Sequence, residues 1–212
     1  PPQGPDELGR LGDYRILKIL GTGGMGFVFL AEDERLRRRV ALKVMKPSEA
    51  RKKGAKDRFL REARATAAVE HDNVITIHQV GEDRGIPFIA MPMLQGASLK
   101  TILQGNQGMA PLRAISICRQ VAAGLFAAHQ TGLIHRDIKP DNLWIESTKE
   151  RVKILDFGLV RNLECEEGLT LQGTVLGTPS YMSPEQAAGE LVDHRSDLFS
   201  LGAVFYQMLS GR

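Results

Sequence analysis

The chain has 212 residues, of which 42% are hydrophobic and 25% charged, and its formal net charge is +3. This composition is typical of a folded globular protein and excludes disorder for most of the chain. No segment approaches the roughly 18 apolar residues of a membrane helix, and the N-terminus lacks the pattern of a signal peptide, so we expect a cytoplasmic protein without membrane contact.

The cysteines and the basic clusters narrow the classes further. The two cysteines, Cys118 and Cys165, form neither a disulfide framework nor a metal cluster, which suits a reducing compartment. Basic clusters at 37–39 and 51–53 can attract nucleic acid, but acidic residues flank both and no aromatic stacking platform accompanies them. We therefore expect solvated surface and no nucleic-acid partner, with nucleic-acid binding as the weaker alternative.

The first half of the chain has the pattern of a small lobe rich in strands. Residues 1–12 contain proline, glycine and acidic residues, and we expect a flexible tail there. Glycine-rich or charged turns separate the following segments, which predicts an antiparallel meander. The expected elements are strands at about 14–21, 25–32 and 38–46, a helix at about 56–69, and strands at about 74–80 and 86–92.

The second half of the chain is dominated by helical patterns. Pro111 suits a first helical position, and apolar residues then recur at three- and four-residue steps as far as Ala128. We expect this helix to be long and mostly buried. A second apolar helix is predicted from about Asp197 to Leu209, with Asp197 capping its start.

The glycine pattern Gly21-x-Gly23-x-x-Gly26 is weak evidence by itself, because dinucleotide-binding folds use the same spacing. In those folds the third glycine opens a helix. Here the residues after Gly26 are aromatic and branched, which favours a strand, so the glycine loop joins two strands and can cover a phosphate. An ordinary hairpin turn is the alternative.

A segment in the second half combines residues suited to phosphoryl transfer. The run His135-Arg136-Asp137-Ile138-Lys139-Pro140-Asp141-Asn142 is followed by Asp156-Phe157-Gly158. A carboxylate such as Asp137 can act as a base, and the ammonium group of Lys139 can neutralise charge on a phosphoryl group. Asn142 and Asp156 offer the hard oxygen ligands that Mg²⁺ prefers.

Five blocks carry a family resemblance. They are the glycine loop, Val40-Ala41-Leu42-Lys43, the segment 135–142, the segment 156–158 and Ser183-Pro184-Glu185. From about Tyr14 to its end, the chain resembles a serine/threonine protein kinase of the eukaryotic-like type found in bacteria. The resemblance implies an α+β, two-lobed protein kinase fold, with a tail at 1–12, an ATP-binding lobe at 13–93 and a mainly helical catalytic lobe at 94–212.

The resemblance also implies an activity and its residues. The γ-phosphoryl group of ATP, bound with Mg²⁺, would pass to serine or threonine of protein substrates. Asp137 and Lys139 would be catalytic, and Asn142 and Asp156 would bind the metal. Lys43 would orient the ATP phosphates with Glu62 as its partner, the alternative being that Glu62 is an exposed surface residue.

The nucleotide site implied by the resemblance draws on both lobes. Pro92 departs from the acidic residue common in the family but keeps the carbonyl used there. Trp144 stands where a smaller aliphatic residue usually underlies adenine, and we hypothesise a stacking surface. The expected nucleotide-binding residues are Leu20, Gly21, Thr22, Gly23, Gly24, Met25, Gly26, Val28, Ala41, Lys43, Pro92, Leu94 and Trp144.

Other residues are expected to support or regulate the site. His135 and Phe157 would stack in an apolar column, and Asp197 would bond the catalytic-loop backbone. Arg136 offers a bidentate partner for a phosphorylated threonine. The candidate regulatory residues are Arg136, Thr170 and Thr174 as autophosphorylation sites, and Thr178 as a partner of Asp137 or Lys139.

Two expectations concern completeness and rival functions. A complete kinase continues beyond the last helix, and one of its later arginines pairs with the glutamate that corresponds to Glu185, so we expect a truncated catalytic lobe. A non-catalytic pseudokinase and a small-molecule phosphotransferase are the rivals. The presence of every catalytic position argues against the first, and the segments Gly177–Tyr181 and Ser183–Glu185, which resemble peptide-holding segments, argue against the second. The oligomeric state is left open.

Overall fold

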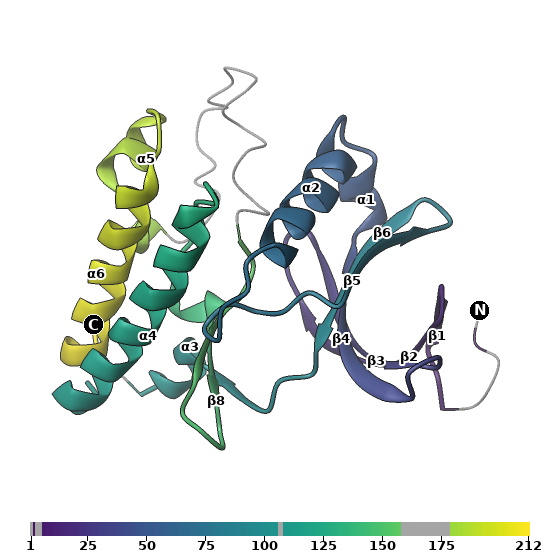
Figure 1. Ribbon diagram of the computed structural model, residues 1–212, viewed down its shortest axis with the longest axis horizontal. Coiled ribbons are helices and arrows are strands. Elements are labelled where there is room, and N and C mark those ends of the chain that lie inside the picture. Colours follow the sequence, from purple (N-terminus) through teal and green to yellow (C-terminus); the bar gives the residue numbers. More distant parts are fainter. Residues whose placement is uncertain (1, 3–5, 106–107, 158–178) are drawn as a thin grey trace. The chain divides into compact units, whose positions relative to one another are not determined.

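The computed structural model describes residues 2, 6–105, 108–157 and 179–212, which form two units (Figure 1). Unit 1 comprises residues 1–68 and 76–94, and unit 2 comprises residues 69–75 and 95–212. The sequence suggested one boundary near residue 93. In the structure the chain enters unit 2 for a short segment, 69–75, before it completes unit 1.

Unit 1 is built on a six-stranded antiparallel sheet with the strand order β1-β2-β3-β4-β6-β5. The predicted strands at 14–21, 25–32, 38–46 and 86–92 are confirmed to within one residue at each end. The strands are β1 Gly9–Leu11, β2 Tyr14–Thr22, β3 Gly26–Asp33, β4 Arg38–Met45, β5 Gln79–Asp83 and β6 Ile86–Pro92.

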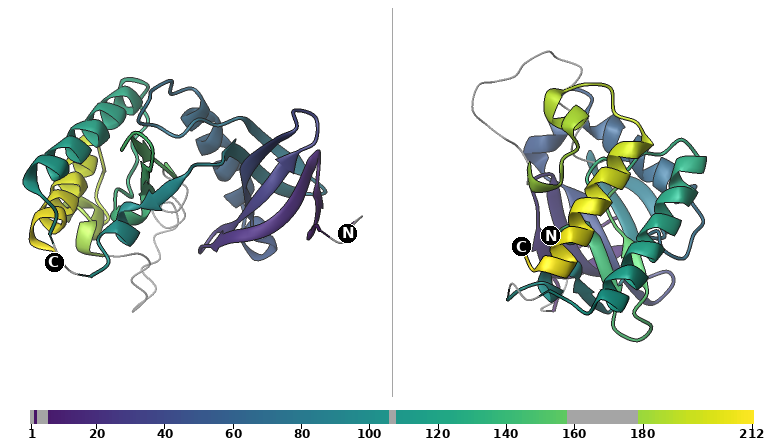
Figure 2. Two further views of the ribbon diagram at one scale, coloured as in Figure 1. Left: turned by 90° about the horizontal axis from the view of Figure 1, so that it is seen from below. Right: turned by 90° about the vertical axis from the view of Figure 1, so that its left-hand side faces the viewer.

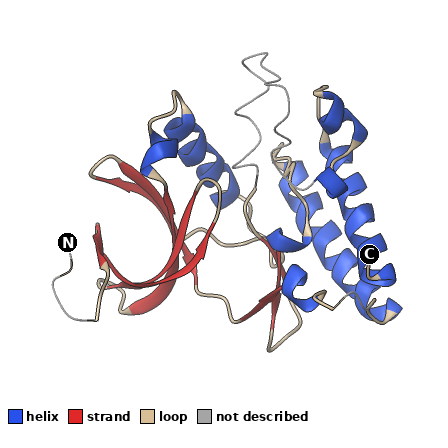
Figure 3. Cartoon of the chain, turned by 180° about the vertical axis from the view of Figure 1, so that it is seen from behind, coloured by secondary structure: helices blue, strands red, loops and turns tan. Residues whose placement is uncertain are grey.

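The two outer strands of this curved sheet, β1 and β5, are tied to each other by polar contacts (Figure 3). The backbone N–H of Gly12 donates to Asp83 Oδ2 at 3.0 Å, and Arg84 Nη2 donates to the carbonyl of Arg10 at 2.7 Å. Strand β1 lies within the segment that was expected to be a flexible tail. The sequence offered no sign of it, because β1 has three residues and its partner is the neighbouring strand β2.

Apolar burial explains why the chain is ordered ahead of residue 13. Leu11 and Tyr14 are 4% and 3% exposed, and the Tyr14 ring meets Phe88 edge to face with 5.6 Å between centroids. The Tyr14 hydroxyl donates to Gln79 Oε1 at 2.5 Å, so the buried ring also satisfies its polar atom. One side chain therefore joins the start of β2 to the first residue of β5.

Two helices complete unit 1. Helix α1 spans Pro47–Ala50, and α2 spans Ala55–Ala67 and packs against β5 and β6. The helix predicted at 56–69 is thereby confirmed, and it ends two residues early. Its buried face carries Phe59, Leu60 and Ala63, which the three- and four-residue spacing of apolar side chains had indicated.

Unit 2 combines a three-stranded sheet with a layer of helices. The longest helices, α4 and α6, lie side by side, and both views of Figure 2 show this arrangement. Val121 and Leu125 of α4 and Val204 and Met208 of α6 are fully buried in one core. The elements are β7 Gly96–Ser98, α3 Leu99–Ile102, α4 Pro111–Gln130, η1 Pro140–Asn142, β8 Leu143–Glu146, β9 Val152–Ile154, η2 Pro179–Tyr181, α5 Pro184–Ala188 and α6 His194–Ser210.

Helix α4 confirms the predicted helix but not its expected burial on most sides. Pro111 is at the N-terminus as predicted. One face is buried in unit 2, whereas Leu112, Ile115 and Phe126 are 82%, 51% and 65% exposed. Periodicity located the helix, but it did not determine how many of its apolar side chains the described residues cover. Among the described residues, no helix is long and apolar enough to cross a bilayer.

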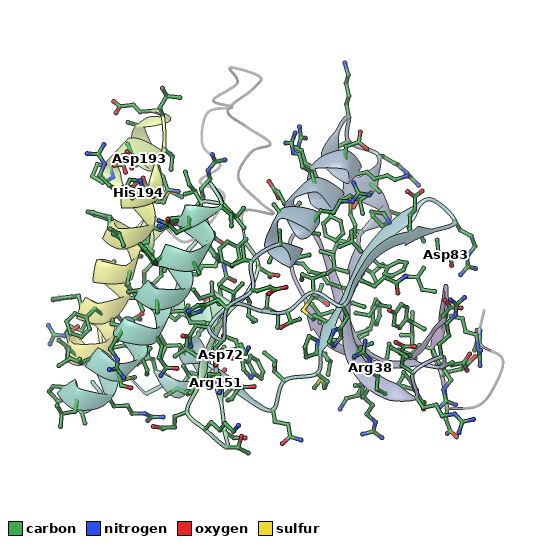
Figure 4. All side chains as sticks on the ribbon, in the orientation of Figure 1. Arg38, Asp72, Asp83, Arg151, Asp193 and His194 are labelled. Carbon is green, nitrogen blue, oxygen red and sulfur yellow. The ribbon has the colours of Figure 1, made fainter. Side chains whose placement is uncertain are left out.

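The predicted strand at 74–80 is wrong. Residue Val74 forms only an isolated parallel bridge with Ile154, the Ile75 N–H donates to the Ile154 carbonyl at 3.0 Å, and β5 begins at Gln79. An ion pair of 2.9 Å between Asp72 and Arg151 also ties this segment to unit 2 (Figure 4). The apolar run was therefore divided between the two units, a tertiary effect that a local pattern does not contain.

Candidate active site

The glycine-rich segment forms the turn between β2 and β3. The Gly23 N–H donates to the Gly26 carbonyl at 2.9 Å, and Lys46 Nζ donates to the Gly23 carbonyl at 2.6 Å. The expected strand-to-strand context is confirmed, and the helix of a dinucleotide-binding fold is absent between these described strands. A Cβ atom added to Gly26 would lie 2.3 Å from the Val44 carbonyl oxygen, so this glycine is required by the close approach of β4.

Lys43 and Glu62 are both buried within unit 1, at 8% and 9% exposure. Lys43 lies in β4 between Val28 of β3 and Ile89 of β6, and Glu62 lies on the buried face of α2. The alternative of an exposed Glu62 is therefore wrong. Buried charges are costly unless they have polar partners, and neither side chain is without one. That the two side chains pair with each other stays a prediction.

The residues expected around adenine lie in both units. In unit 1, Ala41 is buried in β4, Leu20 is 38% exposed in β2, and Pro92 ends β6. In unit 2, Trp144 lies in β8 opposite Ser98 of β7, and it is partly buried. The Trp144 Nε1 atom is shielded from solvent and has no hydrogen-bond partner among the described residues.

The catalytic segment brings Asp137, Lys139 and Asn142 together in unit 2. Lys139 Nζ donates to Asp137 Oδ2 at 2.7 Å, and Asn142 Nδ2 donates to the same oxygen at 3.0 Å. Asn142 Nδ2 also donates to the Asp137 backbone carbonyl at 2.8 Å. A carboxylate held by a cation and an amide is fixed in direction while part of its surface stays open, as a base requires.

His135 is completely buried beneath this segment and is neutral by its contacts. Its Nε2 atom lies 2.7 Å from the Leu155 carbonyl, which only accepts, so Nε2 carries the proton. Its Nδ1 atom accepts the Asp137 N–H at 3.2 Å. Desolvation by burial lowers the pKa of His135, although nearby carboxylates led by that of Asp197 oppose the shift. The expected contact with Phe157 is confirmed, with 4.6 Å between ring centroids.

This burial predicts a pH dependence of stability. We expect the free energy of unfolding to fall as the pH drops below about 6.5, the pKa of an exposed histidine, because only the unfolded chain binds the proton readily. The contribution is fully present above that pH and is lost as the pH approaches the lower pKa of folded His135. One proton limits the slope to about 1.4 kcal/mol per pH unit.

Urea unfolding between about pH 7.5 and 5.5 measures this slope in the unaltered chain and in a His135→Gln variant. His78, whose pKa burial also lowers, is present in both proteins and cancels in the comparison. The variant should have the shallower slope. Equal slopes would contradict the assignment to His135.

Asp197 anchors the backbone of the catalytic segment. Its side chain is 0% exposed, and it accepts from the Arg136 N–H at 2.7 Å, from the His135 N–H at 2.8 Å and from His129 Nε2 at 2.7 Å. The expected bond to the catalytic-loop backbone is confirmed. The expected capping role is wrong, because α6 begins earlier and Asp193, which accepts from the Arg195 N–H, is its N-cap.

The two expected metal ligands lie on connected backbone in unit 2. The Leu155 N–H donates to the Asn142 carbonyl at 2.8 Å, and Asp156 follows directly with a positive φ of 52°. Because Asn142 Nδ2 donates to Asp137, its amide oxygen is the atom left to bind a cation. Within the described residues no three His, Cys, Asp or Glu side chains cluster. An amide and a carboxylate fit Mg²⁺, which usually keeps several water or phosphate ligands.

The segment after the catalytic loop is tied to α6 by residues that sequence reasoning did not single out. Ser196 Oγ donates to Glu185, the residue expected to need a later arginine, and this bond and a backbone bond lower the pKa of Glu185. Tyr181 donates to Gln207 Oε1 at 2.6 Å. Serine and glutamine carry no pattern that reveals such contacts in advance.

The candidate regulatory residues are only partly within the described chain. Arg136 is partly buried and adopts a positive φ of 64°. Thr170, Thr174 and Thr178 lie outside the described residues. The Gly158 position of the Asp-Phe-Gly block does so as well.

Comparison with known proteins gives the same family at each level. A family model described as "Protein kinase domain" matches residues 14–212. The chain is 44% identical over 212 residues to serine/threonine-protein kinase pkn2 of Myxococcus xanthus, covering 98% of this chain and 25% of that protein. It is 42% identical over 202 residues to serine/threonine-protein kinase PknB of Mycobacterium leprae, covering 93% and 32% respectively.

Solved structures agree with these relatives. The kinase domain of Mycobacterium tuberculosis PknI superposes with a TM-score of 0.78 at 29% sequence identity, covering 95% of this chain and 75% of that chain. The chain thus spans about a quarter to a third of the length of the curated relatives and most of a solved kinase domain.

Proposed function

The chain belongs to the protein kinase family, among the bacterial serine/threonine-protein kinases, and on that premise we propose that it transfers the γ-phosphoryl group of ATP to serine or threonine side chains of protein substrates. Protein kinases in general use ATP with Mg²⁺. The proposal covers the activity of the protein in which this chain occurs, since the chain spans only part of its relatives' length.

The observation that carries the proposal is the cluster around the Asp137 carboxylate. Lys139 Nζ and Asn142 Nδ2 reach one oxygen of this carboxylate at 2.7 and 3.0 Å. Such a carboxylate can accept or orient the proton of an attacking hydroxyl group, and the nearby ammonium group can stabilise charge on the phosphoryl group. A pseudokinase has no need for this set, and the peptide-acting relatives disfavour a small-molecule phosphotransferase.

The remaining roles follow residue by residue. We assign Mg²⁺ to Asn142 and Asp156, where the metal would bridge ATP phosphates. Lys43, supported by Glu62, would hold the phosphates. The glycine turn at 21–26 would cover them, and Leu20, Val28, Ala41, Pro92, Leu94 and Trp144 would bind adenine. Since ATP is supplied in the cytoplasm, we propose that the chain acts there.

Regulation by phosphorylation is part of the proposal. Phosphorylated Thr170 or Thr174 would offer oxygens that the guanidinium group of Arg136 can bind in bidentate fashion. Thr178 would contact Asp137 or Lys139. These three threonines carry the regulatory hypothesis on sequence grounds alone.

The test is radiolabelled phosphate transfer by the intact protein, with peptides that differ only in offering serine, threonine or tyrosine. We expect Mg²⁺-dependent labelling of the serine and threonine peptides and little of the tyrosine peptide. Labelling that survives removal of divalent cations with a chelator would contradict the metal assignment. Transfer confined to small alcohols, with none to peptides, would favour the small-molecule phosphotransferase.

A further inference from the structure

The backbone of the catalytic segment has a second anchor, in the segment that follows Ser183. Gln186 Nε2 donates to the carbonyl oxygen of Arg136 at 2.8 Å. The other end of the same amide, Gln186 Oε1, accepts from the Ser183 N–H at 3.2 Å. The N–H group only donates and the carbonyl only accepts, so these two partners leave the Gln186 amide a single orientation.

The bonded carbonyl belongs to the peptide group that leads into the catalytic base. In a planar peptide, the carbonyl of Arg136 and the N–H of Asp137 turn together. That N–H is the one received by His135 Nδ1 at 3.2 Å. Whatever holds the Arg136 carbonyl therefore also sets the plane from which the Asp137 side chain leaves the backbone.

The conformation of Arg136 gives this anchor something to oppose. Its φ of 64° lies in the left-handed region, which costs a residue with a side chain of order 1 kcal/mol or more. Such a conformation persists only where its surroundings enforce it. Asp197 holds the N–H of Arg136 at 2.7 Å, and Gln186 holds its carbonyl at 2.8 Å, so both peptide groups of this residue are fixed.

We propose that Gln186 is a positioning residue of the active site, which sets the Arg136–Asp137 peptide plane and thereby the direction of the Asp137 carboxylate. The proposal rests on the function proposed above for its kinetic consequence. The contact itself does not depend on that function. Gln186 also closes a capping box with Ser183 at the start of α5, so its role in the helix must be separated from its role in the catalytic segment.

The Gln186→Glu variant makes this separation. Glutamate is a usual partner in a capping box, so the bond from the Ser183 N–H is kept. An ionised carboxylate cannot donate, and it would face the Arg136 carbonyl with like charge. Gln186→Ala removes both bonds. Gln104→Glu is the matched control, since it makes the same chemical change at an exposed position of unit 2.

Two measurements on the intact protein decide the matter. In Gln186→Glu we expect faster amide hydrogen exchange across the segment 135–142 and unchanged exchange in α5, whereas Gln186→Ala should speed both. We also expect kcat to fall about 10-fold or more with KM for ATP unchanged, because small misplacements of catalytic groups are costly. Gln104→Glu should match the unaltered protein in both measurements.

A pH profile gives a readout that helix capping would not move. A protonated carboxyl group is shaped like the amide and can donate again. The kcat of Gln186→Glu relative to the unaltered protein should therefore rise as the pH is lowered from about 8 to about 6, as the substituted group takes up its proton.

The outcomes are distinguishable. Unchanged exchange at 135–142 in Gln186→Glu overturns the positioning role even if the protein is an active kinase. Changed exchange in a protein that transfers no phosphate overturns the proposed function and leaves the anchor standing. A constant activity ratio across the pH range would show that the donor to Arg136 has no effect on catalysis, which also overturns the role.

Discussion

Replacing Asp137 with asparagine is expected to lower the rate of phosphoryl transfer by about 10²- to 10⁴-fold, the usual contribution of a general base. The substitution keeps the size of the side chain and an oxygen that can accept from Asn142 Nδ2, so the segment should stay folded. It removes the charge that Lys139 Nζ meets at 2.7 Å and the capacity to take up a proton. Single-turnover transfer of labelled phosphate measures the loss.

Asp141 offers the matched control for this experiment. Asp141→Asn makes the same change four residues along the chain, where an exposed carboxylate pairs with Lys100 at 2.7 Å. An exposed ion pair of this kind is worth about 1 kcal/mol or less, so the control should change transfer little. Equal losses in both variants would show that charge in the segment, and not a base at position 137, is what matters.

The second large effect is expected at Asp197. Asp197→Ala deprives the backbone N–H groups of His135 and Arg136 of their acceptor, and an unsatisfied buried donor costs about 1–3 kcal/mol. With His129 also losing its partner, we expect the free energy of unfolding to fall by about 3 kcal/mol or more. Urea unfolding followed by circular dichroism measures the change.

Asp193 on the same helix separates this anchoring role from helix capping. Asp193→Ala removes the observed N-cap of α6 and should cost about 1 kcal/mol. If Asp197→Ala costs no more than that, its three hydrogen bonds do not stabilise unit 2 as argued here. The kinetic consequence should differ as well, since only the loss of Asp197 releases the peptide groups on either side of His135.

The parts of the fold that the sequence predicted are those that depend on local periodicity. Strands β2, β3, β4 and β6 and helices α2 and α4 each carry enough alternating or helical apolar spacing to be located. Strand β1 is too short for such a signal, and its order comes from contacts with the β5–β6 turn across the sheet. The apolar run at 74–80 was misinterpreted because pairing with Ile154 claims its first residues.

The site divides along the same line. Motif spacing identified Asp137, Lys139 and Asn142, whose side chains the short segment itself brings together. It did not identify Gln186 or Ser196, because their bonds reach partners 50 and 11 positions away and depend on how α5 and α6 fold back. Asp197 was recognised as an anchor, but its place one turn inside α6 followed only from the backbone around Asp193.

The early excursion of residues 69–75 into unit 2 has a consequence for how the chain is made. Asn73 Nδ2 binds the Val152 carbonyl at 2.9 Å, 79 positions later, so this stretch leaves the ribosome long before its partner strand exists. Contacts so distant in sequence form slowly, because a large loop must close first. Neither unit can be excised by one cut, and a protease that nicks the chain near residue 69 or 75 would sever both at once.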